Sequence, residues 1–208
     1  MNLNFNKTNL PFNIFISKKG FTIVEVSILF VIFLIVAFLV APLSLDNSMQ
    51  EKNASKWREV QNDFQNIFDS VNLQKNNRNF VFAEAFNLVM NGEIQADIEP
   101  YKITFLKGTL PSEEYIFTDF KQTNKNATLA YKIYEKPQTD ALGIIMYDVN
   151  GIIGPNTWGK DVFGYNIYPD RLEPFCKQDP INVQKQDCSK SGTGLCCSNS
   201  YLNGGKLN

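Results

Sequence analysis

Hydrophobic residues are concentrated near the N-terminus of the chain, in one continuous run. From Val26 to Ala41 the only polar residue is Ser27. The 21 residues from Phe21 to Ala41 would span roughly 31 Å as a helix, at about 1.5 Å per residue. The hydrocarbon core of a bilayer is about 30 Å thick. The pattern therefore predicts a membrane-spanning helix over residues 21–43.

The next stretch has the periodicity of an amphipathic helix. Apolar residues recur at spacings of three and four, with charged residues between them. We interpret residues 44–75 as the continuation of the same helix, packed on its own domain. Pro42 removes one backbone hydrogen bond and is expected to kink or loosen the helix. The predicted apolar stripe consists of Trp57, Val60, Phe64, Ile67 or Phe68, and Val71.

Later segments are rich in β-branched and aromatic residues, separated by Pro, Gly and Asn-Gly breakers. A short helix over Phe80–Met90 precedes them and is expected to end at Asn91-Gly92. The predicted fold class is α+β, with a long N-terminal helix against a small antiparallel sheet in a domain over residues 76–169. The strands are expected at Tyr101–Leu106, Tyr115–Phe120, Thr128–Glu135, Gly143–Val149 and Val162–Tyr168.

The tail over residues 170–208 is polar, is expected to be loop-like, and contains all four cysteines. An even number of cysteines confined to a short extracytoplasmic segment is typical of disulfides. The two adjacent cysteines are not expected to bond each other, so each should pair with one of the other two. A structural zinc site is the alternative, but no C-x₂-C pair is present. The cysteines are Cys176, Cys188, Cys196 and Cys197.

Composition excludes several classes of function. The chain of 208 residues contains no histidine, which removes Ser-His, Cys-His and His-metal mechanisms. We therefore predict a protein that is not an enzyme. Lys and Arg number 20 against 21 Asp and Glu. This near-balance, with three of the basic residues within positions 1–20, predicts no nucleic-acid partner.

Glu25 is the only charged residue between Phe21 and Leu43. A carboxylate inside a membrane segment is by default a functional hypothesis. A cleavable secretory signal would have a shorter apolar stretch and an A-x-A-like site after it, which this chain lacks. A plain membrane anchor fits the length but gives no reason for Glu25.

The residues around Glu25 form a pattern that is similar to a known signal sequence. Ser17-Lys18-Lys19-Gly20-Phe21-Thr22-Ile23-Val24-Glu25-Val26 resembles the class III signal of type IV prepilins and type II secretion pseudopilins. The resemblance implies that a prepilin peptidase removes residues 1–20 by cutting between Gly20 and Phe21. It also implies N-methylation of Phe21, and pairing of that amine with Glu25 of a neighbouring subunit. Lys18 and Lys19 would keep the leader in the cytoplasm, with the globular domain outside the cytoplasmic membrane.

The segment Asp148–Phe163 resembles a stretch in the globular domains of some pseudopilins and minor pilins. The pattern is similar to the start of a calcium-binding loop, in which side-chain oxygens converge and a glycine permits a sharp turn. The candidate ligands are Asp148, Asn150 and Asp161, and the glycine is Gly151. The alternative is a hairpin whose Asp and Asn side chains cap their own backbone. No full EF-hand pattern is present.

Together these features predict a minor pilin or pseudopilin, a structural subunit of a type IV pilus or a type II secretion-type filament. Its expected partners are other pilin or pseudopilin subunits, the prepilin peptidase and the membrane. No cofactor is required, apart from the calcium hypothesis. The alternative is a single-pass membrane-anchored protein with an extracellular binding module.

Overall fold

A computed structural model describes residues 22–73, 94–134 and 140–207, with side chains for all of these except 39–47. The predicted leader, Phe21 and the helix expected at residues 80–90 lie outside these ranges. The chain divides into two units, Met1–Leu45 and Asp46–Asn208. Within the described residues, no helix is both long enough and apolar enough to cross a membrane.

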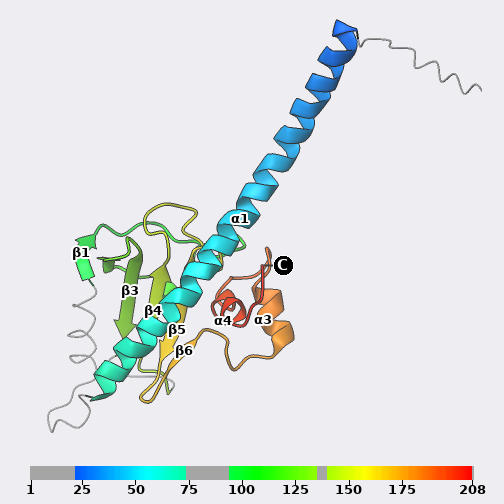
Figure 1. The fold of residues 1–208 in the computed structure, drawn as a ribbon. Coiled ribbons are helices and arrows are strands. Elements are labelled where there is room, and N and C mark those ends of the chain that lie inside the picture. The colour runs from blue at the N-terminus through cyan, green and yellow to red at the C-terminus, as the bar shows by residue number, and fades with distance from the viewer. Residues whose placement is uncertain (1–21, 74–93, 135–139, 208) are drawn as a thin grey trace, which may run out of the picture. The chain divides into compact units, whose positions relative to one another are not determined.

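Helix α1 (Ile23–Leu73) continues through Pro42 without ending. Within the unit Asp46–Asn208, its apolar stripe lies against the sheet and forms the centre of the larger core cluster. Ile67 and Phe68 are both buried, and Trp57 is fully buried. The spacing of three and four therefore places this part of α1 on the core of its own domain. Figure 1 shows α1 running past β3, β4 and β5.

Six strands form one antiparallel sheet in which each strand pairs with the next along the chain. The shortest connections of this meander, residues 124–127 and 168–171, are turns, whereas residues 99–119 and 149–161 form longer connections. The strands are β1 (Ile94–Ile98), β2 (Phe120–Thr123), β3 (Thr128–Ile133), β4 (Gly143–Asp148), β5 (Val162–Ile167) and β6 (Leu172–Pro174).

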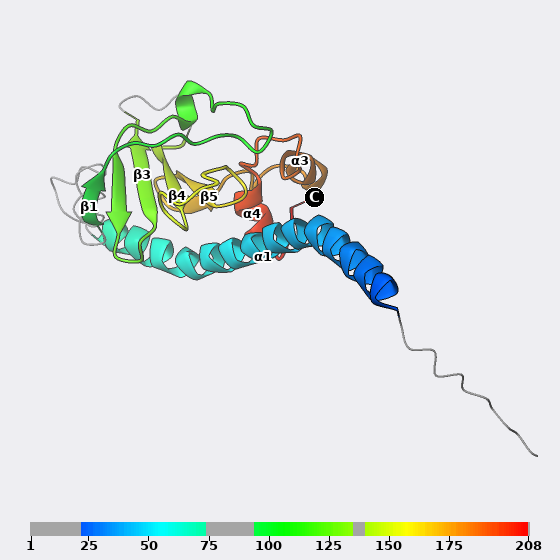
Figure 2. The same cartoon turned by 90° about the horizontal axis from the view of Figure 1, so that it is seen from above.

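Alternation along the central strands gives the sheet two buried faces. In β4, Ile145 and Tyr147 pack in the cluster with α1, whereas Ile144 and Met146 pack in a second cluster. Residues 101–117 cover that second face (Figure 2). The α+β prediction is confirmed, with three layers made by α1, the sheet and this covering segment.

Two of the predicted strands are wrong. Tyr101–Leu106 forms only one bridge, between Thr104 and Thr157. Tyr115–Phe120 is mostly a loop, which runs from the last residue of the 3₁₀ turn η2 (Glu113–Tyr115) to the first residue of β2. Their aromatic side chains are buried against the sheet face, so burial rather than strand pairing accounts for their composition. Strands β1, β2 and β6 were not predicted, since β1 is mostly exposed and β2 and β6 have only four and three residues.

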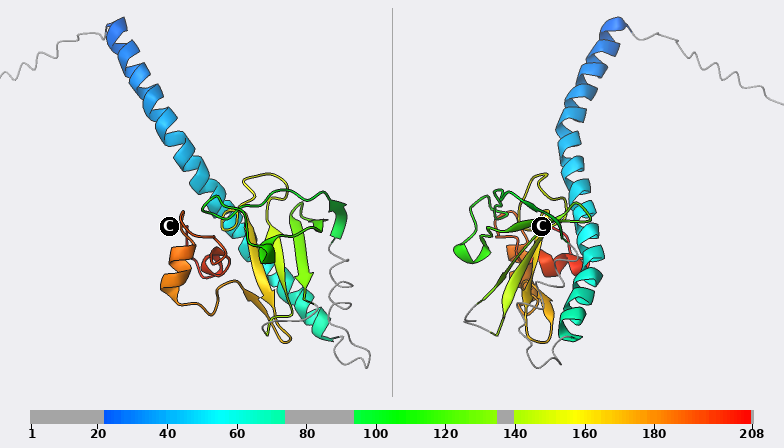
Figure 3. Two further views of the ribbon diagram at one scale, coloured as in Figure 1. Left: turned by 180° about the vertical axis from the view of Figure 1, so that it is seen from behind. Right: turned by 90° about the vertical axis from the view of Figure 1, so that its left-hand side faces the viewer.

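The prediction of a loop-like tail is also wrong. The tail contains β6 and two helices, α3 (Ile181–Asp187) and α4 (Cys197–Leu202). The Trp57 indole N–H donates to the Ser198 carbonyl over 2.9 Å, and the Tyr201 hydroxyl donates to the Gly159 carbonyl over 3.0 Å. Figure 3 shows α4 beside α1. Docking on the core, rather than local apolar content, orders this segment.

The disulfide prediction is confirmed. Cys176 bonds Cys196, and Cys188 bonds Cys197. The adjacent cysteines therefore do not bond each other. The first bridge joins the end of the sheet to the residue before α4, and the second joins α3 to α4.

Candidate functional site

The first turn of α1 is closed by a reciprocal pair of side chains. The Thr22 backbone N–H and hydroxyl both donate to Oε2 of Glu25, over 2.8 and 2.9 Å, and the Glu25 N–H donates to the Thr22 hydroxyl over 3.2 Å. This is a capping box, in which a Thr and a Glu three residues later satisfy each other's backbone donors. The pattern Thr-x-x-Glu was readable in the sequence, but we did not predict this role.

The capping box leaves part of the Glu25 carboxylate available. Its Oε1 accepts no hydrogen bond from the part of the chain that the structure describes. Both Thr22 donors are neutral, so they do not cancel a negative charge. Glu25 can therefore accept a further donor or a cation while the cap stays formed.

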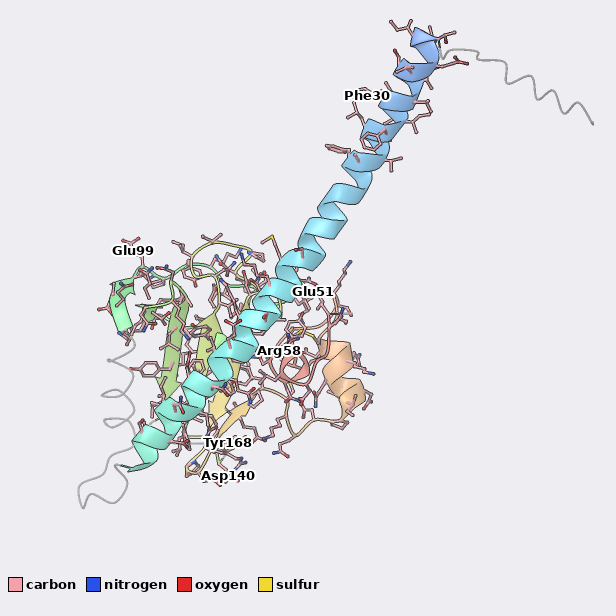
Figure 4. The ribbon with its side chains drawn as sticks, in the orientation of Figure 1. Phe30, Glu51, Arg58, Glu99, Asp140 and Tyr168 are labelled. Carbon is pink, nitrogen blue, oxygen red and sulfur yellow. A yellow bond between two sulfur atoms is a disulfide. The ribbon has the colours of Figure 1, made fainter. Side chains whose placement is uncertain are left out.

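The helix segment that follows is apolar on every side. Each large apolar side chain from Ile23 to Phe38 is at least 50% exposed, and Figure 4 labels Phe30 among them. A helix that is hydrophobic all round belongs in an apolar environment, either a protein core or a membrane. Gly20 and Phe21, the predicted cleavage and methylation residues, lie outside the described residues.

A second candidate site is the loop between β4 and β5. Asp148 and Asp161 are fully buried there. Asp161 accepts the N–H groups of Asn156 and Thr157 over 2.8 and 2.7 Å. Asp148 accepts the Tyr101 hydroxyl over 2.7 Å and the Asn150 N–H over 3.2 Å. These are the hydrogen bonds that the capping interpretation requires.

Helix α1 holds the same loop from the other side. The Asn53 amide donates to the Lys160 carbonyl over 3.2 Å, and the Lys56 ammonium donates to the Val149 carbonyl over 3.0 Å. Neither contact reaches a carboxylate of the loop. The loop is therefore anchored at its two ends by α1, and its buried carboxylates are held by groups of the loop itself and by Tyr101.

Burial dominates the electrostatics of this loop. It raises the pKa of Asp148 to about 8, with the negative charge of Asp161 adding to the shift. Burial also raises the pKa of Asp161, although the Thr157 and Asn156 N–H groups oppose that shift. For Tyr101 too, burial raises the pKa, so its hydroxyl remains a neutral donor to Asp148. Ionising both of two neighbouring carboxylates without a cation costs free energy, because each negative charge disfavours ionisation of the other group.

The calcium hypothesis stays a prediction. The structure brings Asp148 and Asp161 together, with the Asn150 side chain close enough to stabilise the Asp161 charge. Oδ1 of Asn150 and Oδ1 of Asn156 are buried and accept no hydrogen bond from the described residues. Carboxylate and amide oxygens are ligands that calcium prefers. The residues present would fit such an ion, which would relieve the repulsion between the two carboxylates.

The cysteines offer no metal site. Among the described residues, Cys176, Cys196 and Asp187 place candidate ligand atoms within 4.8 Å of one another. Both cysteines are consumed in a disulfide, and no cysteine is free. Asp187 instead accepts the N–H groups of Thr193 and Cys196, over 2.8 and 2.9 Å. Zinc, the alternative at these cysteines, is therefore wrong, because a zinc site needs thiolates.

Comparison of the chain with protein-family models, with curated proteins and with solved structures gives no significant match. Its functional interpretation depends on the residues and contacts described above.

Proposed function

We propose that the protein is a non-enzymatic filament subunit, a minor pilin or pseudopilin of a type IV pilus or type II secretion-type filament. The observation that carries this proposal is the start of α1, where a capped carboxylate begins a helix that is apolar on every side. It directly follows Lys18-Lys19-Gly20-Phe21, which resembles the end of a prepilin leader.

The energetics of insertion support a membrane location for this segment. Fifteen Ile, Val, Leu and Phe residues lie between Ile23 and Val40. At the value of about −0.3 to −0.6 kcal/mol for a residue at the helix centre, they contribute up to roughly −5 to −9 kcal/mol to insertion. A charged residue costs about 2.5–3.5 kcal/mol at the centre of a membrane helix and less near its edge, where Glu25 lies. The segment would therefore insert with Glu25 in place.

Glu25 would then need a cationic partner, because an unpaired charge in low dielectric is costly. Cleavage after Gly20 would create such a cation, the α-ammonium of Phe21. A neighbouring subunit that offers this ammonium to Oε1 of Glu25 would be set in register along the helix. The capping box would remain, because Thr22 uses only Oε2.

The experiment separates the two roles of Glu25 with two substitutions. Glu25→Gln keeps a side chain that can complete a capping box but removes the charge. Glu25→Ala removes both. If the charge directs docking, both variants should be cleaved and retained in the membrane but absent from sheared filaments.

Ser27→Ala is the matched control, since the Ser27 hydroxyl bonds only the Ile23 carbonyl, over 2.7 Å, within the same segment. It should enter filaments like the wild type. Filament incorporation of Glu25→Gln at the wild-type level would show that the cap alone matters and would refute ion pairing.

The alternative is a single-pass membrane protein whose extracellular domain is a binding module. This alternative is supported by the unit Asp46–Asn208, which has its own core and surface clefts. The mass of the mature N-terminus discriminates between the two. A filament subunit should begin with N-methylated Phe21, whereas the anchored module should retain Met1 and the whole leader.

A further inference from the structure

A cleft of about 440 Å³ lies between α1, the β5–β6 edge of the sheet and α4. Its volume falls within the range of about 300–1,000 Å³ typical of small-molecule sites. Every lining residue belongs to the unit Asp46–Asn208. None of the functional residues discussed above lines it.

Amide side chains dominate the polar lining of this cleft. They come from two turns of α1 and from α4, and are Gln61, Gln65, Asn199 and Asn203. Among the described residues that line the cleft, Lys177 is the only charged one, and none carries a carboxylate. Phe64 and Tyr165 also line the cleft but are each only 3% exposed. The aliphatic part of the lining consists of Leu172, Pro174 and Leu202.

The walls of the cleft are already fixed. The Cys188–Cys197 bridge holds the start of α4, and the Asn203 amide donates to the Asn199 carbonyl over 3.0 Å. The Asn199 amide in turn donates to the Gln184 side chain over 2.8 Å. A ligand would therefore not have to order the site, which reduces the cost of binding.

Two lining residues, Gln61 and Lys177, make no side-chain hydrogen bond or ion pair with the described residues. In this they differ from Gln65, Asn199 and Asn203. An amide offers one carbonyl acceptor and two N–H donors, and an ammonium offers three donors. Gln61 and Lys177 are thus the groups with most capacity left for a ligand.

The chemistry of the lining selects one class of ligand. Hydroxyl groups both donate and accept hydrogen bonds, as amides do, and the apolar C–H groups of a sugar ring suit the aliphatic part of the lining. An ammonium without a competing carboxylate favours a ligand that offers a carboxylate. We propose that this cleft binds an acidic saccharide, with its hydroxyls on the amide side chains and its carboxylate on Lys177. This site does not depend on filament assembly.

The test is titration calorimetry on the full chain in micelles of a detergent that contains no sugar. Digalacturonate is the probe, and digalactose is its neutral counterpart. Digalacturonate should bind about tenfold more tightly, and Lys177→Ala should remove this preference. Gln61→Ala should weaken both ligands about threefold to tenfold. Lys185→Ala, which removes an exposed cation of α3 outside the cleft, is the matched control and should change neither affinity.

Three results would overturn the proposal. They are absence of digalacturonate binding at millimolar concentration, equal affinity for the two probes, and an equal loss of affinity in Lys177→Ala and Lys185→Ala. Circular dichroism of each variant before titration ensures that lost binding reports the cleft and not the fold. A saccharide that binds an assembly-defective Glu25→Ala protein with unchanged affinity would support the cleft even if the filament proposal failed.

Discussion

Removal of the Cys188–Cys197 bridge should destabilise the whole unit Asp46–Asn208, not only its C-terminal end. Both sulfurs are buried, and Cys197 opens α4. Helix α4 contacts α1 through the Trp57 indole and contacts the sheet through the Ser198 hydroxyl, which accepts the Gly164 N–H over 3.0 Å. The substitution to make is Cys188→Ala with Cys197→Ala, so that no single thiol is left to exchange.

The expected loss in the free energy of unfolding follows from the length of the loop that each bridge closes. The separation of 9 between Cys188 and Cys197 closes a loop of 10 residues when both cysteines are included, and the chain-entropy relation then gives about 2.7 kcal/mol. For the separation of 20 between Cys176 and Cys196, it gives about 3.3 kcal/mol. Typical domains are stable by about 5–15 kcal/mol. Loss of one bridge should therefore leave the domain folded, whereas loss of both should bring it near unfolding.

Urea denaturation of the full chain in micelles measures this loss. With a slope of about 1–3 kcal/mol per molar urea, 2.7 kcal/mol shifts the midpoint by roughly 1–3 M. Trp57 and Trp158, each fully buried, lie in the two separate core clusters and should report one common transition. The matched variant Cys176→Ala with Cys196→Ala should lose slightly more stability.

Amide hydrogen exchange can contradict the prediction that the whole unit is destabilised. If the double variant lost protection only in α4, with the urea midpoint and the sheet amides unchanged, α4 would be a peripheral tail and the packing argument would fail. A shared loss of protection in α1, the sheet and α4 is expected, because they unfold as one unit.

Three further predictions concern single carboxylates and the cleavage site. In buffer with a chelator, the free energy of unfolding measured by urea denaturation should fall as the pH rises from about 4 to about 8. The reason is that the folded state keeps a proton on Asp148 that the unfolded state has released. A pH profile that Asp148→Asn does not flatten would contradict this. Calcium at 1 mM should raise the melting temperature of the wild type but not of Asp161→Asn in differential scanning calorimetry, and an unchanged wild type would leave only the capping interpretation. Gly20→Val should keep the leader attached, as measured by mass spectrometry of membrane-fraction protein, and a mature mass would exclude the class III signal.

The strongest sequence patterns gave the central elements. The spacing of Trp57, Val60 and Phe64 predicted the buried face of α1, and β3, β4 and β5 lie within one or two residues of the predicted strands. The buried face of α1 repeats every three or four residues, and β4 and β5 are buried over nearly their whole length. Such patterns are visible without knowledge of the neighbouring elements. The even cysteine count likewise predicted disulfides, and the strain of a bond between adjacent residues predicted that Cys196 and Cys197 pair with other cysteines.

The tertiary structure decided what the remaining residues do. The aromatic residues of 101–117 have strand-like composition but cover a sheet face, because side-chain burial there is available without strand pairing. The polar segment Cys197–Leu202 becomes a core helix because Trp57, Gly159 and Gly164 satisfy its polar groups.

The same division holds for the candidate sites. The sequence by itself determined the apolar run and the carboxylate of Glu25 within it, since both are properties of neighbouring residues. Only the tertiary structure could bring Asp148 to Tyr101, or Gln61 to Lys177 across one cleft, because these pairs join separate elements. Local periodicity carries information about what is buried, and it carries none about which buried or cleft-lining groups meet.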